Sequence, residues 1–211
     1  MLTLEFARQY YPSTDPVHGF DHIERVYAMA ERLAQIEGAD LEIVRAAALL
    51  HDIEGSHPAG EERGSHHVQS AELAGDILRE QGWPEERIAA VQHCIRAHRY
   101  RDLSEQPATL EAKILFDADK LDVLGAIGVV RVLGYAQQAG QPAYAPPSQA
   151  FIRTGEDQPG EPHSAYHEHL FKLRNVHKRL FTNEARRIAA DRSAFLDAFF
   201  ERLIDEFSGE R

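Results

Sequence analysis

The chain has 211 residues and a formal net charge of −11, with 34 acidic and 23 basic side chains. This acidic balance disfavours binding to nucleic-acid phosphates, although a small phosphorylated ligand held by a metal remains compatible with it. The single cysteine, Cys94, excludes an intrachain disulfide and a thiolate metal cluster. Because we find neither a secretory leader nor a run of about 18 apolar residues, we expect a cytoplasmic protein without membrane contact.

Apolar residues recur at helical spacing over most of the chain. A short helix at about 2–10 precedes a longer one at about 18–36, whose apolar residues lie three and four apart. A third helix, at about 41–53, follows Asp40 as its N-cap. Nearly every residue from Ala46 to Leu50 is apolar, so this helix is expected at the centre of the core. It ends in His51 and Asp52.

The next segment, 54–64, is polar and rich in glycine, and we expect it to form a lid beside His51 and Asp52. Helices are predicted at about 66–81 and 84–97. In the second of these the apolar stripe continues to His98, whereas His93 points to the opposite side of a regular helix. A helix at about 110–123 then carries Asp119 and Asp122, and a glycine-containing helix begins at Gly125.

The remaining sequence contains a segment rich in proline, glycine and alanine and then two further helices. We predict an insertion loop with little regular structure at about 138–162 and C-terminal helices at about 164–207, separated near Thr182. The fold class is therefore all-α, a single-domain helical bundle over 1–211 with its core at about 17–135. The apolar last helix can pack within the chain or across a homodimer, and the sequence leaves both open.

Four side chains suitable as metal ligands lie on three of the predicted helices, each beside an apolar face: His22, His51, Asp52 and Asp119. In a bundle these faces converge, so two imidazoles and two carboxylates can surround one ion. Such mixed ligation suits Mn²⁺, Fe²⁺, Co²⁺ or Zn²⁺ and leaves positions for water and substrate. The chemistry that this favours is hydrolysis of a phosphate ester or anhydride. Taken singly, each residue is more commonly a helix cap or a buried hydrogen-bonded group.

The ordered set resembles the H…HD…D ligands of the HD-domain metal-dependent phosphohydrolases. The resemblance to stand-alone bacterial HD hydrolases extends over nearly the whole chain and rests on three segments: His22-Ile23-Glu24-Arg25-Val26, Ala47-Ala48-Leu49-Leu50-His51-Asp52-Ile53, and Asp117-Ala118-Asp119-Lys120-Leu121-Asp122 with Gly125-Ala126-Ile127-Gly128. Some of those hydrolases convert (deoxy)nucleoside triphosphates to monophosphate and pyrophosphate. The resemblance implies an HD-type bundle, a divalent cofactor (Mn²⁺, Mg²⁺, Fe²⁺, Co²⁺ or Zn²⁺, with Mn²⁺ favoured) held by the four residues, and attack by a metal-activated water.

Further roles are implied by the same resemblance. Asp52 would be catalytic as well as a ligand, and His98, in preference to His93, would protonate the leaving group or orient the water. Lys120 would neutralise substrate phosphate. Asp122 would contact a sugar hydroxyl of the substrate. Arg25 is also assigned to substrate binding, although such an arginine more commonly forms a structural ion pair.

Other histidines have simpler explanations. His57, His66 and His67 are expected on the surface, and a second metal ion held partly by them is the alternative. His167 and Lys172 are also expected to be exposed.

Three functions remain open at this point. The first is hydrolysis of (deoxy)nucleoside triphosphates, with a small-molecule nucleotide as the partner. The second is hydrolysis of another phosphorylated metabolite or of a nucleoside monophosphate, as in a 5′-nucleotidase. The third is a metal-containing nucleotide-binding regulator without turnover. The sequence lacks the Gly-Tyr-Pro signature of the cyclic-di-GMP branch of HD proteins, which disfavours that substrate.

Overall fold

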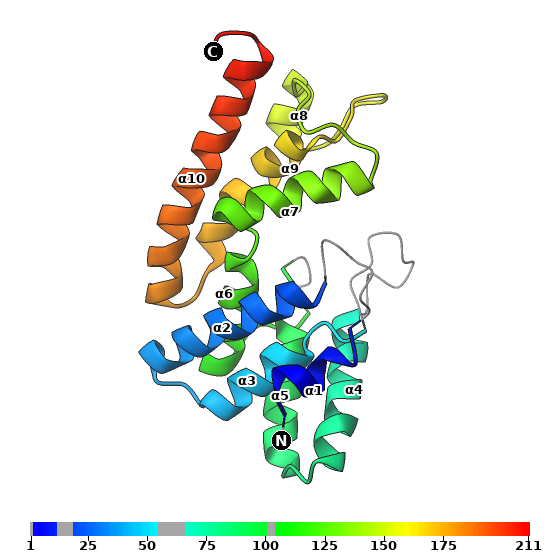
Figure 1. The fold of residues 1–211 in the computed structure, drawn as a ribbon, viewed down its shortest axis with the longest axis vertical. Helices are drawn as coiled ribbons and strands as arrows, with labels where there is room; N and C mark the ends of the chain where they lie inside the picture. Colours follow the sequence, from blue (N-terminus) through cyan, green and yellow to red (C-terminus); the bar gives the residue numbers. More distant parts are fainter. Residues whose placement is uncertain (1, 12–18, 55–65, 101–103) are drawn as a thin grey trace. The chain divides into compact units, whose positions relative to one another are not determined.

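A computed structural model describes residues 2–11, 19–54, 66–100 and 104–211. In these ranges every regular element is a helix, which confirms the all-α prediction (Figure 1). The internal contacts divide the chain into two compact units, Met1–Lys120 with Leu180–Ala185 and Leu121–Arg179 with Arg186–Arg211. The expectation of a single domain over 1–211 stays a prediction. The expected lid lies almost wholly outside the described residues, as does His57.

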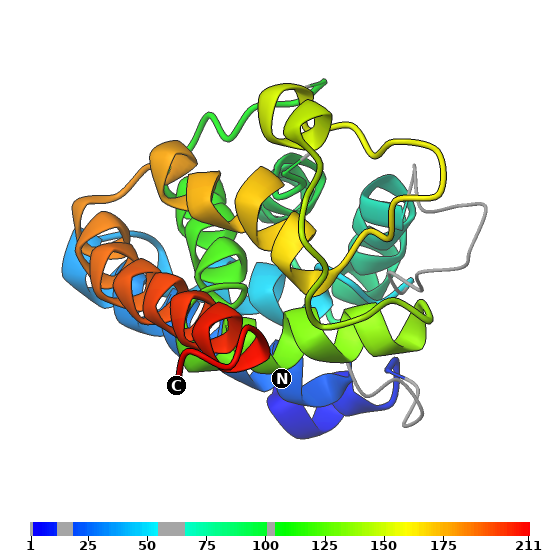
Figure 2. The same ribbon diagram turned by 90° about the horizontal axis from the view of Figure 1, so that it is seen from above.

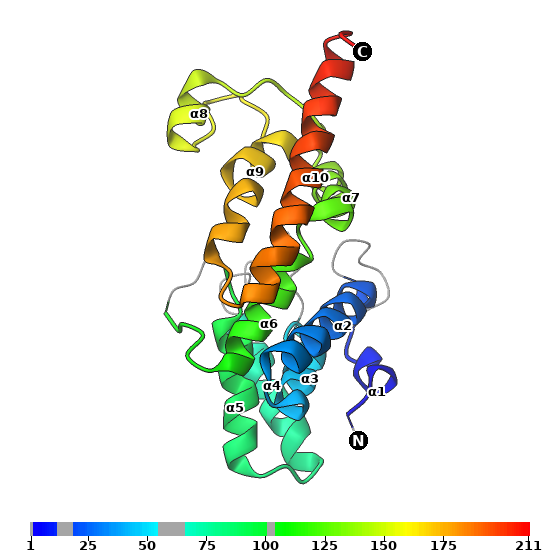
Figure 3. The same cartoon turned by 90° about the vertical axis from the view of Figure 1, so that its left-hand side faces the viewer.

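The first unit is built around one buried helix. Its helices are α1 (Leu4–Arg8), α2 (Phe20–Glu37), α3 (Leu41–Leu50), α4 (His66–Glu80), α5 (Glu85–Ala97) and α6 (Leu110–Leu121), of which the last residue begins the second unit. Helix α3 packs on α2 and α5, and α4 packs along α5 (Figure 3). The run from Ala46 to Leu50 is at most 1% exposed, as expected of a central helix.

Capping residues define where α3 begins. Gly38 ends α2 in the left-handed conformation with φ of 77°, which a residue without a side chain adopts at little steric cost. The Asp40 carboxylate then accepts hydrogen bonds from the backbone of Glu42 and Ile43. Arg87 of α5 donates to both oxygens of the same carboxylate at 3.0 Å. One aspartate therefore sets the start of α3 and its contact with α5.

A buried carboxylate on α6 fixes the segment Leu180–Ala185 to the first unit. Asp117 is fully buried and accepts hydrogen bonds from the backbone of Phe181 at 2.9 Å and of Thr182 at 2.7 Å, and from the Thr182 hydroxyl at 2.8 Å. These three donors lie more than 60 residues away in the sequence. The chain is thereby held immediately before α10 (Asn183–Phe207) begins.

Replacement of Asp117 by alanine should destabilise the protein strongly. The Asp117→Ala variant leaves buried donors without an acceptor, so we expect the free energy of unfolding to fall by about 2–4 kcal/mol. Urea denaturation followed by circular dichroism measures this. Asp76→Ala, at an exposed aspartate, serves as the control and should change stability by less than about 0.5 kcal/mol. Equal stability of the two variants would show that the Asp117 hydrogen bonds contribute little.

The second unit contains α7 (Gly125–Gln138), α8 (Gln149–Thr154), α9 (Ala165–Phe171), a 3₁₀ helix, η2 (Leu173–Arg179), and most of α10. Helix α9 packs on α7 and on η2 (Figure 2). The expected break near Thr182 is confirmed by the start of α10. The helix predicted before it is shorter than expected and continues as η2.

The segment 138–162 contains one short helix, α8, that the sequence did not predict. Ser148 caps this helix by accepting from the Phe151 backbone, and Gly155 ends it with φ of 74°. A side chain at Gly155 would come within 2.5 Å of the Phe171 ring, so glycine is needed there for close packing as well. The capping signals are present in the sequence, but a six-residue helix has too few residues to show apolar periodicity.

His167 was expected at the surface and is instead fully buried. Its ring bonds Ser164 at 2.7 Å and Glu161 at 3.2 Å. Glu161 also accepts from the backbone of Ser148 and Gln158, and these hydrogen bonds lower the pKa of Glu161 to about 2. The polar groups of this segment therefore satisfy one another inside the unit. Lys172, which pairs with Glu168 at 3.0 Å, is partly exposed.

Candidate metal centre

The end of α3 presents His51 with one nitrogen fixed and the other unbonded. Nδ1 donates to the Ala48 carbonyl at 2.9 Å, one of the carbonyls in the last turn that lack a helical partner. Burial lowers the pKa of His51 to about 4, so the ring is neutral at pH 7 and Nε2 carries the lone pair. Nε2 is buried and has no hydrogen-bond partner in the described part of the chain. Such an atom fits a metal ligand, because an ion would replace its lost hydration.

Asp52 lies between two pairs of imidazoles. Its Oδ2 is 3.9 Å from Nε2 of His22 and 3.7 Å from Nε2 of His51. Its Oδ1 is 3.5 Å from Nε2 of His98 and 3.8 Å from Nε2 of His66. Most of these separations exceed a hydrogen bond and suit separate ligands of a shared ion. Burial raises the pKa of Asp52, but the imidazoles of His51, His98 and His22 outweigh it and hold that pKa well below its ordinary value.

Asp119 of α6 completes the first set of donors. Its Oδ1 lies 3.6 Å from Nε2 of His22, while Oδ2 pairs with the Lys120 ammonium. Burial by itself raises the pKa of Asp119, but the Lys120 ammonium and the nearby imidazoles lower it by more. The pKa of Asp119 therefore lies below its ordinary value, and the carboxylate is ionised. Donor atoms of His22, His51 and Asp119 lie within 4.8 Å of one another. The structure thus brings together the four predicted ligands, and their binding of an ion stays a prediction.

The ring of His98 is oriented in the same way as that of His51, by a hydrogen bond from Nδ1 to the carbonyl three residues earlier. His98 caps α5, its Nδ1 bonds the Ile95 carbonyl at 2.5 Å, and its Nε2 faces Asp52. Donor atoms of His51, Asp52 and His98 form a second group within 4.8 Å. The apolar stripe of α5 was the sequence signal that selected His98.

His93 is not placed in this cluster. Its Nδ1 lies 2.5 Å from Glu105, and its Nε2 accepts from the Ala108 backbone at 3.1 Å. The physical reason is helical phase, because residues five positions apart lie on different faces of a helix. The structure therefore gives no geometric support to a catalytic role for His93.

His66 also lies in the cluster, although it was expected on the surface, with a part in a second metal site as the alternative. It is the first residue of α4, its side chain is only 12% exposed, and its ring also contacts that of His98. The expectation that His66 and His67 lie on the surface was therefore wrong, and His67 is 3% exposed. No local pattern marks His66, because its approach to Asp52 joins residues of different elements.

The three predicted substrate residues have different surroundings. Lys120 pairs with Asp119 and lies 5.5 Å from the centre of the Phe116 ring. Arg25 pairs with Asp21 at 2.5 Å along α2. Asp122 belongs to the second unit, where it is buried and pairs with Arg131. Substrate contacts of all three stay predictions. Of the three, Lys120 lies next to a predicted ligand in the sequence and forms an ion pair with it, Asp119.

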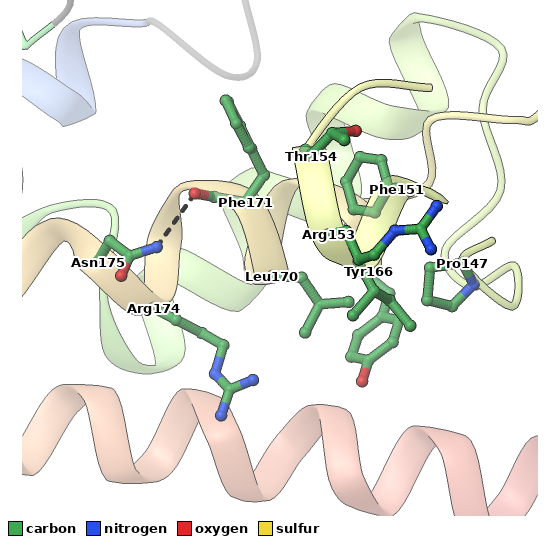
Figure 4. A pocket seen from close by; sticks show the side chains of 11 residues that line it. Pro147, Phe151, Arg153, Thr154, Tyr166, Leu170, Phe171, Arg174 and Asn175 are labelled. Carbon is green, nitrogen blue, oxygen red and sulfur yellow. Dashed lines mark hydrogen bonds between the residues drawn. The ribbon is translucent and has the colours of Figure 1, made fainter. Parts of the chain in front are cut away.

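A separate pocket of about 460 Å³ lies in the second unit among α8, α9 and η2 (Figure 4). Phe151, Tyr166 and Leu170 supply apolar walls, and Arg174 lies at one side. Arg174 is 3.6 Å from Asp197, which balances its charge. None of the site residues predicted from the sequence lines this pocket.

No helix in the described part of the chain has the length and apolar character to cross a membrane.

The segment of the chain that contains the cluster matches a known protein family. The HD domain family matches residues 19–124, a range that contains every member of the cluster. The chain belongs to the HD-domain family. It is 30% identical over 195 residues to the uncharacterized protein YpgQ of Bacillus subtilis (strain 168), an alignment covering 91% of this chain and 85% of that protein.

Solved structures agree with this assignment. The structure of Bacillus subtilis YpgQ in complex with ADP is 28% identical, has a TM-score of 0.72, and the match covers 97% of both chains. An HD-superfamily hydrolase from Bacillus thuringiensis is 27% identical with a TM-score of 0.71, and the match covers 97% of this chain and 94% of that one. The fold is thus the HD fold, and the protein is a metal-dependent phosphohydrolase of the HD superfamily.

Proposed function

We propose that this HD hydrolase converts (deoxy)nucleoside triphosphates to monophosphate and pyrophosphate. The observation that carries the proposal is the buried cluster of His22, His51, Asp52 and Asp119 with the Lys120 ammonium beside it. The cluster can hold a cation, and the lysine adds a second positive charge where an anionic phosphate chain would bind. The ADP complex of the similar YpgQ supports a nucleotide as the ligand.

The cofactor in this proposal is one divalent ion, with Mn²⁺ favoured, held by those four residues. Such an ion lowers the pKa of a bound water and polarises a phosphoryl oxygen. The protein prepares the site before any ion arrives, since His51 is held in one tautomer by Ala48 and both carboxylates are ionised. The unbonded Nε2 of His51 is the clearest sign that the residues fit the ion.

His98 and His66 would act on the other side of Asp52. Their Nε2 atoms face Oδ1, the oxygen that is turned away from His22 and His51 and has no hydrogen-bond partner in the described part of the chain. In this proposal His98 orients the attacking water or protonates the leaving group. The same three donors also suit a second ion.

The number of metal ions bound per chain distinguishes proton transfer by these histidines from the binding of a second ion. With saturating Mn²⁺ we expect one ion in each wild-type chain and one in the His66→Ala variant, because the proposed ion is held by His22, His51, Asp52 and Asp119 and not by His66. Inductively coupled plasma mass spectrometry after gel filtration measures the ratio. The matched control is His177→Ala, at an exposed histidine, which should keep the wild-type ratio. Two ions in wild type and one in His66→Ala would contradict the single-ion proposal and assign His66 to a second metal site.

Anion-exchange analysis of products tests the proposed reaction. The Mn²⁺-loaded protein is incubated with a panel of nucleoside and deoxynucleoside mono- and triphosphates. We expect monophosphate and pyrophosphate from triphosphates, and neither product with Asp52→Ala. Orthophosphate from monophosphates would replace the proposal with a nucleotidase, and nucleotide binding without any product would replace it with a regulatory function.

A further inference from the structure

Tyr11, the third residue after α1, lies with its hydroxyl at the end of α3. The hydroxyl donates to the Leu49 carbonyl at 2.9 Å. Leu49 is in the last turn of α3, where carbonyls lack helical partners, and it is followed within three residues by His51 and Asp52. The Tyr11 side chain thus satisfies a backbone group immediately before the predicted ligands.

The Tyr11 hydroxyl also interacts electrostatically with Asp52. Burial, together with the charge of Asp52, raises the pKa of Tyr11 well above its ordinary value. The hydroxyl therefore keeps its proton at neutral pH and remains a donor to Leu49.

The Tyr11 ring contacts the start of α2, the helix that carries His22. The rings of Tyr11 and Phe20 are tilted against each other with centroids 5.4 Å apart. Phe20 is the first residue of α2 and lies two positions before His22. Tyr11 accordingly joins the first turn of α2 to the last turn of α3, the two places from which three of the four predicted ligands extend.

Helix α1 is fixed so that Tyr11 is held in place. The Arg8 guanidinium lies 4.3 Å from the centre of the Phe20 ring and forms an ion pair with Glu24 at 2.6 Å. Thr3 caps α1 by accepting from the Phe6 backbone at 3.1 Å. An aromatic contact, an ion pair and a helix cap therefore precede the Tyr11 hydrogen bond along one short segment.

We propose that Tyr11 is a positioning residue of the metal centre, whose hydroxyl holds the last turn of α3 so that His51 and Asp52 face His22. Without the hydroxyl, the Leu49 carbonyl loses the hydrogen bond from Tyr11, and the turn that carries His51 and Asp52 is less well fixed. This inference rests on the metal site proposed above. It does not depend on the identity of the substrate.

The test compares Tyr11→Phe with wild type in metal binding. The variant keeps the ring against Phe20 and removes only the hydroxyl. We expect its Mn²⁺ dissociation constant, measured by isothermal titration calorimetry, to rise by about 10-fold or more, the usual result of losing a group that orients metal ligands. The visible absorption spectrum of the Co²⁺-loaded protein should change as well, because that spectrum reports ligand geometry.

Two variants separate positioning from packing. Tyr10→Phe, at the neighbouring tyrosine, should bind Mn²⁺ as wild type does. Phe20→Leu weakens the ring contact but keeps the Tyr11 hydroxyl, and should raise the dissociation constant by less than about 3-fold. An effect of Phe20→Leu as large as that of Tyr11→Phe would assign the role to packing and overturn the inference.

The remaining outcomes are also decisive. Equal affinity and an equal Co²⁺ spectrum in Tyr11→Phe and wild type would overturn the positioning role while leaving the metal site intact. An unfolded Tyr11→Phe chain, detected by circular dichroism before titration, would assign the hydroxyl to folding and also overturn it. Failure of the wild type itself to bind Mn²⁺ or Co²⁺ would overturn both this inference and the proposed metal site.

Discussion

Asp52→Asn should reduce kcat by at least about 10³-fold with the preferred nucleoside triphosphate, the largest effect expected of any single substitution here. The reason is charge, because Asp52 supplies a carboxylate between His22 and His51 on one side and His98 and His66 on the other. Asparagine keeps the volume but provides a neutral amide. Steady-state kinetics at saturating Mn²⁺ measures the loss.

The control for this substitution is Asp21→Asn on α2, an exposed aspartate that pairs with Arg25. It should leave kcat within about 2-fold of wild type, since surface ion pairs contribute little. Urea denaturation of metal-free Asp52→Asn should show a change of no more than about 2 kcal/mol, so that lost activity does not reflect lost folding. A variant that folds and retains more than a tenth of the wild-type kcat would contradict the role given to Asp52.

Metal binding should stabilise the folded protein and be required for turnover. At a free Mn²⁺ concentration of about 100 times its dissociation constant, the free energy of unfolding should rise by about 2.7 kcal/mol, because an ion that binds only the folded state stabilises it by mass action. Removal of the ion with EDTA should abolish both this increment and hydrolysis. Urea denaturation with and without Mn²⁺ measures the increment.

His51→Gln provides the matched test, because it removes the buried Nε2 that has no hydrogen-bond partner in the described residues. This variant should lose the Mn²⁺-dependent increment and the activity together. The comparison variant is His177→Gln, at an exposed histidine of η2, which should keep both. Full Mn²⁺-dependent stabilisation of His51→Gln would show that the ion binds elsewhere.

The parts of the fold that local pattern determines could be predicted from the sequence. The apolar run before His51 placed α3 in the core, and the phase of the α5 stripe separated His98 from His93. Both inferences depend only on residues within one helix, where spacing fixes direction. The ordered set His22, His51, Asp52 and Asp119 could be selected in the same way, because each residue adjoins an apolar face.

Features that depend on distant contacts could not be predicted in this way. The approach of His66 to Asp52 and the hydrogen bonds from Thr182 to Asp117 join residues on different elements, and nothing in their local sequence indicates the partner. No apolar spacing or motif marks Tyr11, which follows a short helix, although its hydroxyl contacts α3. Tertiary packing, which single-sequence periodicity does not encode, decides these contacts.

The most direct test of the proposed site is anomalous diffraction at the manganese absorption edge. Crystals of the full chain would be grown with Mn²⁺ and a non-hydrolysable deoxynucleoside triphosphate. We expect an anomalous peak within ligand distance of His22, His51, Asp52 and Asp119, with the phosphate chain beside the ion and Lys120 near that chain. Manganese bound at another place, or a triphosphate bound away from these four residues, would contradict this expectation.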